Sequence, residues 1–164
     1  MKLKESMEKS KEISLRKMQW LLFKLGFFKI PIIGFVKPQL LVLNENESHV
    51  RIKIRRRTKN HLNSMYFGAL AVGADVAAGL HAFYFAESMG YKVSFAFKGF
   101  SGEFIKRAES DVIFKINQGE LVRNAIEKSA HTGERINQEI DVIATNVQAE
   151  EVAIFKMIVS VKVK

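Results

Sequence analysis

The chain has 164 residues, of which 48% are hydrophobic and 26% charged, so it holds enough apolar material for the core of one domain. It contains no cysteine, which excludes disulfides, cysteine-ligated zinc and a thiol nucleophile and fits a cytoplasmic protein. The net charge is +9, but the basic residues are scattered and no known nucleic-acid-binding motif accompanies them, so nucleic acid is not an expected partner.

The N-terminal part of the chain is predicted to be helical and apolar. Residues 5–24 have the pattern of a helix that ends near Gly26, and residues 20–36 are mostly apolar. Two lysines and a proline interrupt this stretch, which therefore falls short of the roughly 18 uninterrupted apolar residues that span a membrane. We expect the helix to dock on the core of the protein. Peripheral contact with a membrane surface, through its lysines and aromatic residues, is the alternative.

The rest of the chain alternates pairs of strands with helices. Apolar residues at every second position predict strands, and stretches rich in glycine, asparagine and charged residues separate them. In chain order, we expect strands at 40–43 and 48–57, a helix at 66–89 closed by Gly90, a strand at 93–97 that resumes at 103 after a bend at 99–102, a strand at 112–116, a helix at 119–130, and strands at 140–144 and 155–163.

The helix at 66–89 has almost no polar face, and a helix that is apolar all round is buried all round. The order of elements therefore predicts an α+β fold in which a curled antiparallel sheet wraps around this helix. We expect one domain over residues 1–164, with an N-terminal helix and apolar lead-in at 1–36 and the core at 37–164. Because such a sheet has edges that a second copy can cover, we also expect a homodimer or a dimer of dimers.

One acidic residue, Asp75, lies in the middle of this apolar helix. Burying an unpaired carboxylate is costly, so Asp75 must be paired, protonated or exposed to a cavity in which it has a task. The structural alternative is a partner such as His81 of another subunit, Asn60 or a backbone N–H. His81 of the same chain lies six residues further on, about 240° around the helix, and does not pair with Asp75 easily.

The order of elements and the stretch at 60–79 resemble the hotdog-fold acyl-CoA thioesterases, in particular the phenylacetate-pathway branch. That branch carries a loop reading Asn-Pro-x-Gly-x-x-His-Gly-Gly and then an Asp or Glu seven residues after the last glycine. Asn60 stands at the loop asparagine, and Asn63 at the first glycine, where asparagine is the next best residue for a left-handed backbone. Gly68 stands at the last glycine and Asp75 at the carboxylate.

Tyr66 and Phe67 stand where that branch has its His-Gly pair. The chain therefore resembles a branch of the hotdog superfamily that has the asparagine loop and the acidic helix residue but lacks His-Gly-Gly. By this resemblance Asn63, Tyr66 and Phe67 are expected to contact substrate, with Tyr66 as a wall of the pocket.

The resemblance implies a thioesterase. Asp75 would be the base or the nucleophile, and Asn60 would orient the water or the carbonyl. The backbone N–H of Gly68, at the start of a helix, would hold the oxyanion. In the family, the glycine of one subunit and the carboxylate of the other share a site at the dimer interface. The structural alternatives are a packing role for Gly68 and turn roles for Asn60 and Asn63.

The implied substrate is an acyl-CoA, with no cofactor besides the coenzyme A of the substrate. No metal is expected, because the four histidines lack metal-ligand spacing. The phosphates of coenzyme A require cations, for which Lys106 and Arg107 are candidates, as are Lys98 and residues 55–57. A rival function is an acyl-CoA or fatty-acyl binding protein that does not hydrolyse its ligand. A third is a lipid-handling protein that contacts the membrane surface through residues 20–36.

Overall fold

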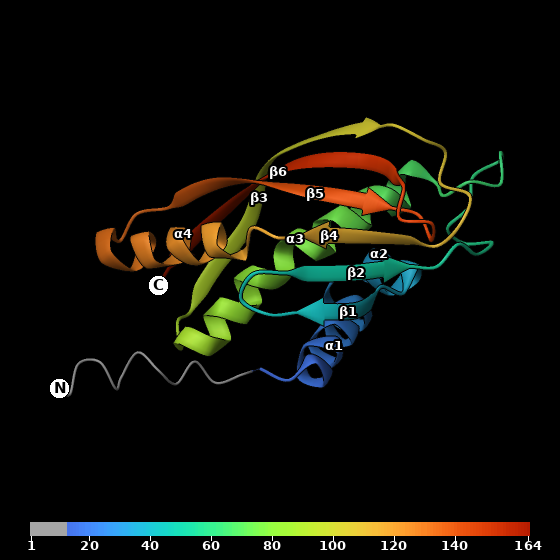
Figure 1. Cartoon of the computed structure of the whole chain (residues 1–164). Coiled ribbons are helices and arrows are strands. Elements are labelled where there is room, and N and C mark those ends of the chain that lie inside the picture. Colours follow the sequence, from blue (N-terminus) through green and yellow to red (C-terminus); the bar gives the residue numbers. More distant parts are fainter. Residues whose placement is uncertain (1–12) are drawn as a thin grey trace.

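The computed structural model describes residues 13–164, so the part of the predicted N-terminal helix at 5–12 lies outside the described residues. In the described part, one antiparallel sheet of six strands curls around a long helix, α3 (Phe67–Met89) (Figure 1). This is the α+β hotdog architecture that the sequence predicts, with the long helix at the centre and additional helices before the first strand.

The strands lie in the order β1-β2-β4-β5-β6-β3, and every neighbouring pair is antiparallel. Helix α4 packs against β5, β6 and α3. The elements other than α3 are, in chain order, α1 (Leu15–Lys24), the π-helical turn η1 (Leu25–Lys29), α2 (Pro31–Val36), β1 (Gln39–Leu43), β2 (Ser48–Ile52), β3 (Val93–Phe104), β4 (Val112–Ile116), α4 (Gly119–Thr132), β5 (Ile136–Thr145) and β6 (Glu151–Val163).

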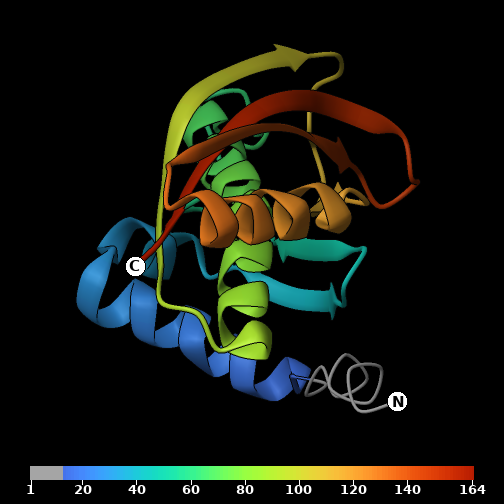
Figure 2. The same cartoon turned by 90° about the vertical axis from the view of Figure 1, so that its left-hand side faces the viewer.

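Helix α3 is apolar on every side, and the sheet and the N-terminal helices together enclose it (Figure 2). Its small residues let the sheet come close. At Gly73, the Cβ of a larger residue would lie 2.2 Å from the ring of Phe114, a fully buried residue of β4. The helix ends at Gly90, as predicted, in the left-handed conformation at a φ of 71°. Among residues 13–164, α3 is the one helix long and apolar enough to cross a membrane, yet most of it is buried inside the fold.

Strand β2 is shorter than the predicted strand at 48–57. Its pairing with β4 stops at Ile52, opposite Val112, where β4 begins. Beyond this point the chain turns, because the hydroxyl of Thr58 accepts a hydrogen bond from the Arg55 N–H and donates one to the Lys53 carbonyl. The alternation of apolar and basic residues continues past the end of β2, but there is no partner strand for it to pair with.

Strand β3 is continuous, so the predicted interruption at 99–102 is wrong. It stays paired with β6 along its whole length, with one irregularity between Phe97 and Gly99. The glycines serve close packing, since a side chain at Gly99 would collide with Ile158 of β6. Strands β5 and β6 both begin four residues earlier than predicted, because they pair with each other from Ile136 to Thr145.

The N-terminal helix docks on the core as predicted, with Met18 and Leu22 buried. Helix α1 ends at Lys24, as predicted, and the chain continues as the π-helical turn η1 and then folds back into α2. The two segments meet at Gly26 and Gly34, where a Cβ on Gly34 would lie 2.6 Å from the Gly26 carbonyl oxygen. In Figure 2, these helices lie on the side of α3 that the sheet leaves open.

The two edges of the sheet differ. At the β1 edge, the side chain of Gln19 from α1 accepts a hydrogen bond from the Leu40 N–H at 2.7 Å and donates one to the Pro38 carbonyl at 3.4 Å. The side-chain amide of Gln19 thus forms hydrogen bonds that the backbone of a neighbouring strand would otherwise form. At the other edge lies β3, on which Phe100 and Phe104 are more than half exposed.

Candidate functional site

A cavity of about 230 Å³ lies between α3 and the N-terminal helices, and Asp75 is one of its lining residues. All its other lining residues are apolar or glycine. They are Leu22 and Leu25 from α1 and η1, Ile30 and Ile33 at and before α2, Val76, Gly79, Leu80 and Phe83 from α3, and Phe95 from β3. Asp75 is therefore the one charged group of this cavity, as its position on an apolar helix indicated.

Within residues 13–164, Asp75 makes no hydrogen bond or ion pair, and burial raises the pKa of its carboxyl above the ordinary value of 3.8. His81 is fully buried, and its Nε2 lies 3.0 Å from the Asn44 carbonyl oxygen. Because a carbonyl only accepts, Nε2 carries the proton, and the buried Nδ1 has no partner in the described chain. His81 is thus out of reach of an Asp75 from another copy.

The start of α3 presents the free N–H that oxyanion binding would need. Tyr66 is the N-cap, and its carbonyl accepts from the N–H groups of Ala69 and Leu70. The Gly68 N–H has no acceptor among the described residues, as is usual in a first helical turn. The Tyr66 ring lies against Gly68, because a Cβ there would be 2.5 Å from the ring carbon Cε1. Tyr66 and Phe67 are both exposed, with ring centroids 4.7 Å apart.

The loop before α3 is held by Asn60. Its Oδ1 accepts hydrogen bonds from the Leu62 N–H, the Ser64 N–H and the Ser64 hydroxyl. Asn63 has a φ of 59°, which confirms the left-handed backbone that the sequence predicted at this position. The oxygen of Asn60 is thus committed to the turn, which is the structural alternative given for this residue.

Gly68 and Asp75 share one face of α3 because they are seven residues, almost two turns, apart. That spacing separates them by about 10 Å along the helix axis. A single thioester carbonyl is far smaller than this. Within one chain it cannot bond to the Gly68 N–H while a water held by Asp75 attacks it.

Apart from Lys98, which is on β3, the cations expected to hold coenzyme A lie in two regions. Lys106 pairs with Glu150 at 2.6 Å, and the hydrogen bond from Lys106 lowers the pKa of Glu150. Arg107 is exposed, and the bond from the Met65 N–H to the Ala108 carbonyl, 2.7 Å, holds its segment beside the loop that leads into α3. Residues 55–57 lie in the other region, next to Phe35 of α2.

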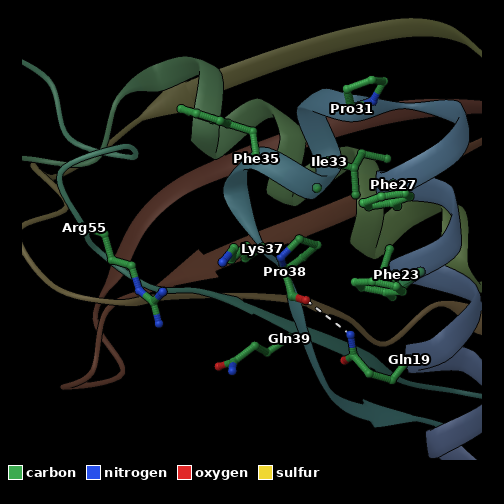
Figure 3. Close-up of a pocket in the computed structure, with 13 residues that line it drawn as sticks. Gln19, Phe23, Phe27, Pro31, Ile33, Phe35, Lys37, Pro38, Gln39 and Arg55 are labelled. Atoms are coloured by element: carbon green, nitrogen blue, oxygen red, sulfur yellow. Dashed lines mark hydrogen bonds between the residues drawn. The ribbon is translucent and has the colours of Figure 1, made fainter.

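Sequence reasoning missed the contribution of the N-terminal segment to the site. A larger cavity, about 620 Å³, opens between α1, η1, α2 and the start of β1. Figure 3 shows Phe23 and Phe27 on one side of it and Lys37 and Arg55 toward the other. The two cavities share Leu22 and Ile33 as lining residues. The mostly apolar composition of residues 20–36 was the available signal.

Within residues 13–164, no three histidine, aspartate or glutamate side chains are grouped as metal ligands would be. These residues offer the chemistry of one half-buried carboxyl group, a free helix N-terminus and an apolar cavity.

A family model matches residues 19–161, which is most of the chain. The chain belongs to the DUF4442 family, described as a domain of unknown function. None of the curated proteins matches it.

Solved structures share the fold of this DUF4442 chain. A Pseudomonas aeruginosa protein described as a probable thioesterase is 21% identical with a TM-score of 0.72, over 88% of this chain and 95% of that one. A protein of unknown function from Chlorobaculum tepidum has a TM-score of 0.78 at 9% identity, over 91% and 96%. A thioesterase from Haemophilus influenzae has a TM-score of 0.64 at 8% identity, over 93% and 92%. At these identities the likeness establishes the hotdog fold.

Proposed function

We propose that the protein is an acyl-CoA thioesterase in which Asp75 is the catalytic carboxylate. The observation that carries the proposal is an unpaired carboxyl group in an apolar cavity on the central helix. A carboxyl group whose pKa is shifted by burial and that lines a cavity is a candidate for a chemical task. Structures of the same fold that are described as thioesterases support the reaction class.

The chemistry follows from the environment of Asp75. Burial raises the pKa of its carboxyl, which makes the ionised form a stronger base than an exposed aspartate. Acting as a base, it takes a proton from a water as the water oxygen bonds to the thioester carbonyl carbon. The tetrahedral intermediate collapses, the C–S bond breaks, and the thiolate of coenzyme A takes up a proton. Direct attack by the carboxylate, forming an anhydride that water then opens, is the variant with the same products.

The oxyanion of that intermediate needs a donor, and the free Gly68 N–H at the positive end of the α3 dipole suits it. Because Gly68 and Asp75 of one chain are about 10 Å apart, we propose that each site combines Gly68 of one copy with Asp75 of another. The open edge at β3, with Phe100 and Phe104 exposed, offers the surface through which two copies would pair.

Coenzyme A would lie outside the apolar cavity, with its phosphates near the loop at 58–66. Arg107 is the cation best placed for them, because it is exposed, carries no carboxylate partner in the described chain and lies beside that loop. Lys106 is a weaker candidate, since it is already paired with Glu150.

A second candidate function is acyl-CoA or fatty-acyl binding without hydrolysis. The position of the Tyr66 ring against Gly68 favours it, because the ring covers part of the approach to the Gly68 N–H. The likeness to the phenylacetate-pathway branch is also incomplete at Tyr66 and Phe67. Hydrolysis would then require the exposed Tyr66 ring to swing aside when substrate enters.

The experiment is a panel of acyl-CoAs of different chain length, with the released thiol as the readout. It compares the wild type with Asp75→Asn, which keeps the shape of the side chain and removes the base. Glu134→Gln is the control, because Glu134 is an exposed carboxylate remote in sequence from the site elements. We expect thiol release by the wild type and by Glu134→Gln, and a loss of at least about 100-fold in Asp75→Asn.

Equal turnover by the wild type and Asp75→Asn would remove Asp75 from the mechanism. Saturable binding of acyl-CoA without thiol release by either protein would replace hydrolysis by the binding function. The cross-subunit site has its own test, in which the Asp75→Asn and Gly68→Val variants are mixed. If subunits exchange, about a quarter of all sites should then combine an intact Gly68 with an intact Asp75.

A further inference from the structure

The N-terminal helices expose far more apolar surface than the fold uses. Helix α1 already buries Met18 and Leu22 against the core, yet the same segment carries a second apolar face directed outward. Six large side chains of this outer face are between 53 and 70% exposed: Trp20, Phe23, Phe27, Phe28, Ile32 and Phe35. Single exposed apolar residues are ordinary, whereas a contiguous set of this size marks an interaction surface.

The aromatic side chains of this outer face form a continuous row. Ring centroids are 5.3 Å apart between Trp20 and Phe23, 6.0 Å between Phe23 and Phe27, and 4.8 Å between Phe27 and Phe28. Phe35 lies on the other side of the larger cavity, which Phe23 and Phe27 also line (Figure 3). The row thus borders a hollow of about 620 Å³ that is lined mostly by apolar residues, with Lys37 and Arg55 among the polar ones.

The charges carried by the segment that holds this row are all of one sign. Residues 13–38 contain five basic residues and no acidic residue. Lys24 lies over the Trp20 ring, 5.5 Å from its centroid, and the guanidinium of Arg57 lies 5.4 Å from the centroid of Phe35. Within the described chain, neither Lys24 nor Lys29 has a carboxylate partner. The cations are therefore free to meet negative charge from outside.

We propose that the outer face of α1, η1 and α2 docks on an anionic lipid bilayer. Aromatic and aliphatic side chains enter the boundary between headgroups and acyl chains, while lysine and arginine meet the anionic headgroups. A second copy of the chain fits this face less well, because pairing it with itself would bring like charges together with no acid from residues 13–38 between them. The segment lies in the plane of the membrane surface, since Pro31 and the break in the helix at Ile30 keep it from spanning.

Docking in this way has a consequence for the site beside Asp75. Leu22 and Ile33 separate the hollow in the docking face from the cavity that holds the carboxyl group. A docked chain therefore holds its apolar cavity next to a source of acyl chains. The docking itself is independent of the proposed hydrolysis, because it is read out as lipid binding.

The test is co-sedimentation of the full chain with vesicles of pure phosphatidylcholine and with vesicles of an equal mixture of phosphatidylcholine and phosphatidylglycerol. Trp20 is the single tryptophan of the chain, so its fluorescence reports on this face alone. We expect binding to the anionic vesicles, weak binding to the neutral ones, and a shift of Trp20 emission to shorter wavelength with the anionic vesicles only.

Two double variants separate the apolar and the electrostatic contributions. Phe27→Ser with Phe28→Ser should weaken binding by at least about tenfold, and its fold should persist because both rings are two-thirds exposed. Lys24→Gln with Lys29→Gln should weaken binding to anionic vesicles by about tenfold or more. This lysine variant also tests the proposal if the serine variant does not fold. The apolar control is Val147→Ser, at another side chain that is 60% exposed.

The charge control is Lys128→Gln with Lys162→Gln, two exposed lysines on α4 and β6, which should leave binding within about twofold of the wild type. Three results would overturn the proposal. One is the absence of binding to anionic vesicles. Another is an equal loss of binding in the charge control, which would mean adsorption through the net charge of +9 alone. The third is loss of self-association in the Phe27→Ser, Phe28→Ser variant, which would make this face an interface between copies.

Discussion

The close approach of α3 to the sheet gives a stability prediction that can be worked out from the structure. Replacing Gly73 by alanine places a Cβ 2.2, 2.3 and 2.6 Å from three ring carbons of Phe114. Phe114 is fully buried, so its ring has no free space to move into. Overpacking of this kind costs about 1–3 kcal/mol, and the overlap here is at the severe end.

The same substitution also has a favourable effect, because alanine is better than glycine inside a helix by about 1 kcal/mol. We therefore expect Gly73→Ala to lower the free energy of unfolding by about 1–2 kcal/mol. Gly79→Ala, on the same helix, is the matched control. Its Cβ would lie 3.3 Å from the partly exposed ring of Phe95, which can yield, so this variant should be neutral or more stable by up to about 1 kcal/mol.

The assay is urea denaturation followed by circular dichroism, with equal slopes required for the comparison. Adding Phe114→Leu should relieve the collision, so the double variant should be less destabilised than the sum of the two single variants by at least about 0.5 kcal/mol. If Gly73→Ala were as stable as Gly79→Ala, the ring of Phe114 would not lie against the helix, and the packing described for α3 would be wrong.

Three further outcomes are expected. Burial raises the pKa of Asp75, so the folded chain binds this proton more tightly, and stability falls as the pH rises through the ordinary value of 3.8 toward the raised one. Asp75→Asn should therefore be inactive yet more stable than the wild type in urea at neutral pH. Burial lowers the pKa of His81 below 6.5, so stability falls as the pH drops through 6.5. His81→Gln should flatten this slope more than His49→Gln, since the ring of His49 is partly exposed; equal slopes would contradict the burial of His81. Gln19→Ala leaves a β1 N–H without its acceptor and should cost about 1 kcal/mol in thermal unfolding, against a change within about 0.5 kcal/mol for the exposed Gln148→Ala.

The sequence was sufficient for the parts of the fold that depend on local pattern. The helix at 66–89 was predicted within one residue of α3, because its apolar composition and Gly90 act locally. The same pattern limited Asp75 to a paired, a protonated or a cavity-lining carboxyl, and the structure has it at a cavity. The length of β2 could not be predicted, because it is set by where its partner β4 begins.

The N-terminal part of the site could not be predicted, for a different reason. The direction of the segment after α1 depends on the contact between Gly26 and Gly34, which are eight positions apart and have no periodic signal. That contact decides that Leu22 and Ile33 face Asp75 while Phe27 faces outward. Composition showed an apolar segment, but only the tertiary arrangement distributes its residues between the cavity and the surface.

The side chain of Gln19 has a consequence for assembly. A sheet with two bare edges can add copies without end, as fibres do, whereas this sheet has one edge occupied by an amide from its own chain. If two copies join through β3, both outer margins of the joined sheet are β1 strands that already hold Gln19. The Leu40 N–H is then unavailable to a further strand at either margin, which disfavours growth of the sheet beyond two chains.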